Sequence, residues 1–243
     1  MTFNPSLVYS NIKTLSKSSG VKLGDIEAAA GASPGYLSRL GSKEDDKTNS
    51  VVVDLLISAS EKLNVSIETL ISRDISQATE TEKKIIQFID KLTIETTTCV
   101  RSWNKVSEES FDGRLPSEPL NPLAVLGEYD EDSGHRYSSY FSSRFDDSAI
   151  LNGSGYKTIL SGNTTVYLFK TQTPSETGRL LSDDAYEFYL YHNSSVIPLY
   201  NCIKQNQNLF ALAANLYKEA KASAKNGSLS YTSNSLIDNY LKN

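Results

Sequence analysis

The chain has 243 residues, of which 39% are hydrophobic and 22% charged, a composition typical of a globular protein with two ordinary domains. Its net charge of −5 argues against a nucleic-acid surface spread over the whole chain, because phosphate binding depends on Lys and Arg. Two isolated cysteines and two isolated histidines exclude a disulfide framework and a structural zinc site. No apolar run could cross a membrane and the first residues lack signal-peptide features, so we expect no membrane association and a cytoplasmic location.

The first 72 residues carry five stretches with the apolar spacing of helices. They are residues 6–19, 23–30, 33–40, 51–63 and 66–72. Gly31 can supply the positive φ of a tight turn between the second and third helices. We expect Ser33 to cap the third helix, with Pro34 at its first position, and Ser66 to cap the fifth.

Three segments of this region are similar to one known family. The segments GVKLGDI (20–26), AGASPGYLSR (30–39) and LLISASEKLNVSIETL (55–70) closely resemble the lambda-repressor and Cro-like family, also called XRE. The resemblance implies an all-α, five-helix DNA-binding domain over residues 1–75. It also implies a helix-turn-helix whose third helix enters the major groove of double-stranded DNA.

The resemblance and the general geometry of the motif also suggest which residues would contact DNA. Solvent-facing residues at the start of a recognition helix read base edges, and nearby cations hold phosphates. The base-reading candidates share the third helix and its start, and the phosphate candidates are lysines on either side. They are Ser33, Pro34, Gly35, Tyr36, Ser38 and Arg39, with Lys22, Lys43 and Lys47 for phosphate.

Structural roles for these residues remain open at this point. Arg39 could instead form a salt bridge to Asp25 or Glu27, and Tyr36 could lie in the core of the small domain. Lys43 and Lys47 could belong to a solvated loop, because three consecutive acids lie beside them.

The rest of the chain divides into a predicted helical segment and a predicted α+β domain. Residues 79–92 are expected to form a helix that begins with a capping box of Thr79 and Glu82, so residues 76–95 could be a linker or a dimerisation helix. Residues 96–243 are expected to form an α+β domain with an antiparallel sheet and C-terminal helices. Its predicted strands are 96–103, 137–145, 156–160, 165–170 and 185–192, with a hairpin turn at 161–163, loops at 112–122 and 128–132, and helices at 209–221 and 233–241.

The sequence gives no catalytic, cofactor or metal residue. The self-cleaving peptidase found in many repressors of the family needs a Ser and Lys pair and an Ala-Gly cleavage site in the linker. The Ala-Gly pair of this chain, Ala30 and Gly31, lies inside the helix-turn-helix, and Ser154 and Lys157 are too close in sequence. Phosphate-binding glycine motifs do not occur, and the acidic run 130–132 lacks the ligand spacing of a calcium loop.

Aromatic residues are frequent in the predicted sheet. They could line a ligand pocket, but they are more typical of the packed face of a sheet. They are Trp103, Tyr137, Tyr140, Tyr156, Tyr167, Tyr186, Tyr189 and Tyr191. Since Tyr189 and Tyr191 would point away from the face that Tyr186 occupies, both faces of the sheet could be covered.

The sequence therefore predicts a multidomain transcriptional regulator, a repressor, that binds an operator as a homodimer through its third helix. Its C-terminal domain would pair subunits or sense a small-molecule or protein effector. The alternative is a protein-interaction module, such as a phage-encoded or antitoxin-like factor. In that case the C-terminal domain would bind a protein partner and DNA binding would serve autoregulation.

Overall fold

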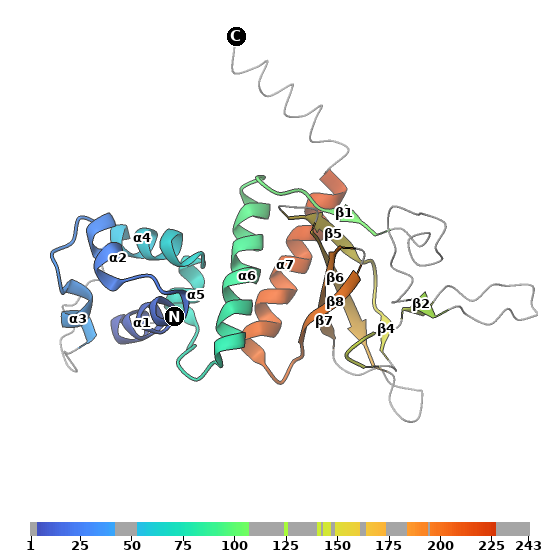
Figure 1. Ribbon diagram of the computed structural model, residues 1–243, viewed down its shortest axis with the longest axis horizontal. Helices are drawn as coiled ribbons and strands as arrows, with labels where there is room; N and C mark the ends of the chain where they lie inside the picture. Colours follow the sequence, from blue (N-terminus) through green and yellow to red (C-terminus); the bar gives the residue numbers. More distant parts are fainter. Residues whose placement is uncertain are drawn as a thin grey trace, which may run out of the picture. The chain divides into compact units, whose positions relative to one another are not determined.

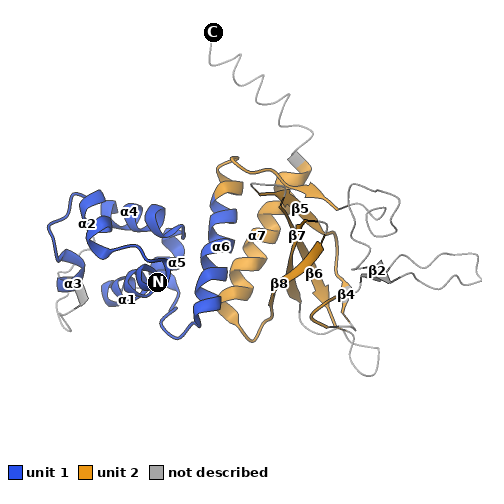
Figure 2. Cartoon of the chain, viewed as in Figure 1, with its two compact units in different colours: residues 1–94 blue, residues 95–243 orange. Residues whose placement is uncertain are grey.

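The computed structural model describes residues 4–41, 53–106, 124–125, 140–141, 143–146, 149–160, 164–173, 184–193 and 195–226. The chain divides into two compact units, residues 1–94 and 95–243, here called unit 1 and unit 2 (Figure 2). The described part of unit 1 is helical and that of unit 2 combines strands with a helix, so the fold is an α+β arrangement in two units (Figure 1). Lys43, Lys47, the loops at 112–122 and 128–132, the turn at 161–163 and the helix at 233–241 lie outside the described residues.

Unit 1 begins with five helices in the predicted order. They are α1 (Pro5–Ser19), α2 (Leu23–Ala29), α3 (Tyr36–Gly41), α4 (Val53–Leu63) and α5 (Ile67–Ser72). The predicted end of α1 at residue 19 is confirmed, and Gly20 follows it with a left-handed φ of 73°. The predicted Ser66 cap is confirmed by a 3.1 Å bond from the Thr69 N–H to the Ser66 Oγ. Helices α1 and α5 are also joined, since the buried Asn11 amide donates to the Leu70 carbonyl at 3.0 Å.

The predicted start of α3 is wrong by two residues. We expected Ser33 as its cap and Pro34 as its first residue, but the helix begins at Tyr36. The reason is Gly35, whose φ of 77° is left-handed and cannot belong to a right-handed helix. Ser33 and Pro34 therefore belong to the connection between α2 and α3.

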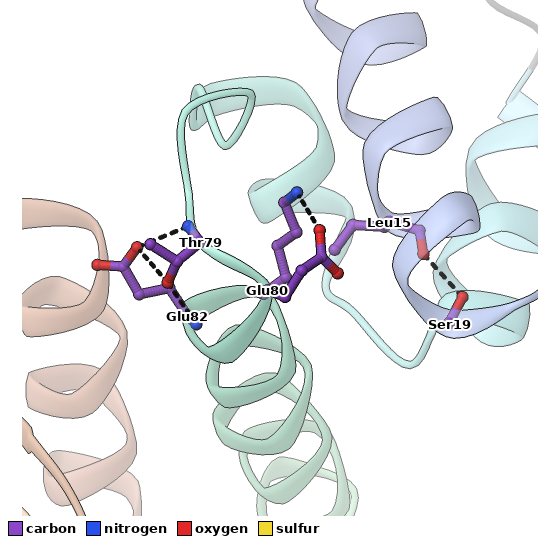
Figure 3. Close-up of polar contacts among 6 residues, drawn as sticks. Leu15, Ser19, Thr79, Glu80 and Glu82 are labelled. Atoms are coloured by element: carbon purple, nitrogen blue, oxygen red, sulfur yellow. Dashed lines mark hydrogen bonds and ion pairs between the residues drawn. The ribbon is translucent and has the colours of Figure 1, made fainter.

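The next helix, α6 (Glu80–Thr97), confirms the predicted capping box (Figure 3). The Thr79 N–H donates to the Glu82 carboxylate at 2.8 Å, and the Glu82 N–H donates to the Thr79 hydroxyl at 3.2 Å. The helix runs past the predicted end at residue 92, so the predicted strand 96–103 is wrong. Trp103 fixes the end of the helix, because its indole N–H donates to the Thr96 hydroxyl at 2.8 Å and its side chain is buried.

The side chain of Asp90 ties α6 to the N-terminus of α5. Its carboxylate accepts the Ser66 N–H at 3.2 Å, and only 1% of the residue is exposed. Burial away from water is the largest effect on this carboxyl and raises its pKa above the ordinary value, although hydrogen bonds from Thr69 and Ser66 oppose the shift.

This raised pKa makes stability depend on pH in a direction that can be tested. A carboxyl whose pKa is higher in the folded state contributes stability below its unfolded pKa, and this contribution is lost as the pH rises through the folded pKa. We therefore expect Asp90→Asn to gain free energy of unfolding relative to wild type between about pH 4 and pH 7. Urea denaturation of both proteins at the two pH values measures the difference. The exposed Asp54→Asn is the control, and an equal change in both variants would contradict the prediction.

Unit 2 contains an antiparallel sheet whose strand order is β1-β5-β6-β7-β8, with β4 also paired to β6. The strands are β1 (Asn104–Lys105), β4 (Ile150–Leu151), β5 (Tyr156–Ile159), β6 (Thr165–Gln172), β7 (Ala185–His192) and β8 (Ser195–Cys202). A separate pair is formed by β2 (Ala124–Val125) and β3 (Tyr140–Phe141), and α7 (Gln207–Asn226) follows the sheet. Three predicted strands, 156–160, 165–170 and 185–192, are confirmed, as is the predicted helix 209–221.

One further strand prediction needs correction, and one long strand was not predicted. In the predicted strand 137–145 the described strand is only β3, and residues 143–146 form a bend instead. The sequence reading missed β8, whose Pro198 is unusual in a strand. Proline is tolerated here because β8 lies at an edge of the described sheet, where an N–H is not required on the open side.

Aromatic side chains pack on both faces of the sheet, as the alternation in β7 predicted. On one face Tyr186 lies 5.3 Å from Phe210 and 5.6 Å from Tyr217 of α7, measured between ring centroids. On the other face Tyr189 contacts Phe169 at 5.9 Å in an edge-on arrangement. The described tyrosines at 156, 167, 186 and 189 are buried, which confirms their interpretation as core. None of the described helices combines the length and apolar character that a membrane crossing requires.

Candidate nucleic-acid interface

The candidate interface is built around α3, which is held in place by a carboxylate from α2. The two oxygens of Glu27 accept the Gly35 N–H at 2.9 Å and the Leu37 N–H at 2.8 Å. Glu27 is only 5% exposed, and Leu37 is fully buried beside it. Because a helix start leaves N–H groups without partners, this carboxylate replaces the usual capping side chain. The position of α3 is therefore fixed from α2.

This bond changes what the start of α3 can do. Backbone N–H groups at the start of a helix commonly bind phosphate in DNA complexes. Two of them, those of Gly35 and Leu37, are bonded to Glu27 instead. Contact with DNA at this end would therefore depend on side chains.

Arg39 lies on the exposed side of α3 and folds back over the residues before the helix. One of its terminal nitrogens donates to the Ser33 hydroxyl at 2.7 Å, and the other donates to the Pro34 carbonyl at 3.3 Å. All three residues are exposed, as is Ser38 on the same helix. Of the two acids predicted as ion-pair partners of Arg39, Glu27 directs both carboxylate oxygens to the backbone of α3. The structure thus brings Ser33, Pro34 and Arg39 together on the solvent side, and Ser38 is exposed on the same helix as Arg39.

The other candidates are placed less directly. Tyr36 is half-buried, so it is neither a core residue nor a freely exposed one, and Gly35 is also half-buried. Lys22 is exposed immediately before α2. Lys13 of α1 is exposed as well, and its ammonium lies 5.7 Å from the centre of the Tyr9 ring.

The residue that the sequence reading missed is Glu27, which we considered only as a partner of Arg39. The usual signal for a helix cap is a Ser, Thr, Asp or Asn next to the helix. Glu27 lies eight residues before Gly35 and on the preceding helix, so a local rule cannot find it. The sequence offers one weak signal, which is that Glu27 directly follows Ile26 on the short predicted helix, and the structure shows both residues to be buried.

The part of the chain that the structure describes contains no group of three His, Cys, Asp or Glu side chains able to hold a metal ion. Comparison with known proteins found no matching family model, no matching curated protein and no matching solved structure.

Proposed function

We propose that the chain is a sequence-specific DNA-binding regulator that contacts the major groove through α3. The observation that carries the proposal is the exposed Arg39 on α3, bonded to the exposed Ser33 just before a helix that Glu27 holds by two hydrogen bonds. A fixed helix with polar side chains on its solvent side meets the geometric requirement for reading base edges.

Arg39 would be the main base-reading residue. Its guanidinium can form two parallel hydrogen bonds to guanine, the commonest specific contact to that base. Its present bonds to Ser33 and Pro34 are exposed, so they can be exchanged for DNA at little cost in desolvation. Those bonds also restrict the side chain before it binds, which lowers the entropy lost on binding.

Lys22 would supply a phosphate contact beside the groove. It is exposed at the start of α2, where a cation can approach the DNA backbone without entering the groove. Since a single small domain contacts few base pairs, we also propose a homodimer that occupies two half-sites of an operator.

A binding experiment on the full chain tests this function. A preferred DNA sequence is first selected from a random duplex library, and affinities are then measured by fluorescence anisotropy at moderate salt. We expect Arg39→Ala to weaken binding to the selected sequence by about 1–3 kcal/mol, while binding to random DNA changes much less. Lys91→Ala, which removes one exposed positive charge from α6, is the matched control.

Two results would overturn the proposal. The first is the failure of the library to yield any sequence bound more tightly than random DNA. The second is an equal, small effect of Arg39→Ala and Lys91→Ala on the selected sequence, which would show that Arg39 acts only through its charge.

A further inference from the structure

Unit 2 contains a cavity of about 260 Å³ where β6 ends, β7 begins and β8 ends. A volume equal to roughly eight water molecules admits a small organic molecule and is too small for a nucleotide. Most of the lining residues are polar, although Ala149, Ala185 and Ile203 also contribute. The side chains that matter here are Asp146, Thr171, Thr173, Asp184, Glu187 and Asn201.

The first unusual feature of the lining is Glu187, a fully buried carboxylate in the middle of an aromatic strand. It accepts hydrogen bonds from the hydroxyls of Ser143 at 2.9 Å, Thr171 at 3.0 Å and Tyr189 at 2.6 Å. These donors are neutral, and no cation among the described residues pairs with it. Burial raises the pKa of this carboxyl, and the nearby Asp146 adds to the shift. A buried carboxylate without a cation is costly for the folded protein.

The second feature is Asn201 of β8, whose side-chain oxygen is buried without a hydrogen-bond partner in the described part of the chain. Such orphaned acceptors are rare in folded proteins and indicate a missing donor. The neighbouring acids are acceptors themselves: Asp184 accepts from Lys170 at 2.8 Å, and Asp146 accepts from the Thr173 hydroxyl at 2.6 Å. The Asn201 oxygen is therefore an acceptor in the cavity lining that no donor of the described residues reaches.

We propose that this cavity binds a small ligand with a positively charged nitrogen, an ammonium or a guanidinium group. The charged nitrogen would donate to the Asn201 oxygen and lie in the negative field of Glu187 and Asp146. Lys204 also borders the cavity, but it is exposed and its charge is therefore screened by water. This site goes beyond the proposed DNA-binding function and does not depend on it.

The test measures ligand binding to the full chain in the absence of DNA, by titration calorimetry and by the shift in Tm. The cationic ligands are putrescine and methylguanidine, and the controls are 1,4-butanediol and succinate, which match putrescine in length but are neutral or anionic. We expect a cationic ligand to bind and to raise Tm, since it stabilises only the folded state, and the controls to leave Tm unchanged.

Variants locate the binding in the cavity. Glu187→Gln keeps the size of the side chain, and Asn201→Ala removes an oxygen that has no hydrogen-bond partner among the described residues. We expect each to weaken binding on the order of tenfold or more, while the exposed Glu61→Gln leaves it unchanged. The inference is overturned if neither cation binds at millimolar concentration, or if both cavity variants bind the cation as tightly as wild type.

Discussion

Replacing Glu27 by alanine is expected to lower the free energy of unfolding by about 2–4 kcal/mol. The reason is that the carboxylate satisfies two backbone N–H groups, those of Gly35 and Leu37, next to a fully buried side chain. Without it these donors lose their partners, and α3 loses its connection to α2. We therefore expect specific DNA binding to weaken, although the loss of a negative charge by itself would favour binding to DNA.

Urea denaturation followed by circular dichroism measures this effect, and the same anisotropy assay measures binding. Asp25→Ala is the matched control, because Asp25 is an exposed acid two residues before Glu27 on the same helix. Glu27→Gln should be intermediate, since an amide offers one acceptor oxygen and one unsuitable donor group. If Glu27→Ala and Asp25→Ala were equally stable, the carboxylate would not be the support of α3.

Replacing Gly155 by alanine is expected to destabilise the sheet of unit 2 by about 1–3 kcal/mol. A Cβ atom at this position would lie 2.3 Å from the Phe169 ring. The ring cannot easily move, because Phe169 is fully buried and stacks on Tyr167 at 6.2 Å. Close packing on the cavity-side face of the sheet therefore requires glycine here.

A second substitution distinguishes overlap from a general effect of losing glycine. Combining Gly155→Ala with Phe169→Leu should recover part of the lost stability relative to the sum of the single changes. Gly24→Ala is the control, since a Cβ at Gly24 in α2 would meet nothing within 4 Å. That change should be neutral or stabilising. Strictly additive effects of Gly155→Ala and Phe169→Leu would contradict the overlap.

Local signals predicted most of unit 1. The left-handed Gly20, the Ser66 cap and the capping box of Thr79 and Glu82 each depend on residues within one helical turn, and each is confirmed. The start of α3 was mispredicted for the opposite reason. The conformation of Gly35 goes with a bond to Glu27 on another helix, which a rule about neighbouring residues cannot anticipate.

Long-range contacts also explain the errors in unit 2. The threonine-rich segment after residue 92 has strand propensity, but it ends a helix because Thr96 bonds to the buried Trp103 indole. Ser33, Ser38 and Arg39 are exposed in the structure, but their predicted contacts with DNA stay a prediction. The cavity was not predicted. The sequence does carry a signal for it, because Glu187 is the one acidic residue of the aromatic strand β7.

The edge strand β8 has a consequence for the behaviour of the protein at high concentration. An exposed edge offers a row of backbone groups on which another sheet can add, which leads to aggregation. Here Pro198 removes one donor, and a bulge between Phe188 and Tyr189 of β7 shifts the pairing so that Leu199 is an extra residue. These two features make β8 a poor template for strand addition, and Pro198→Val would be a way to create an aggregating form of the chain.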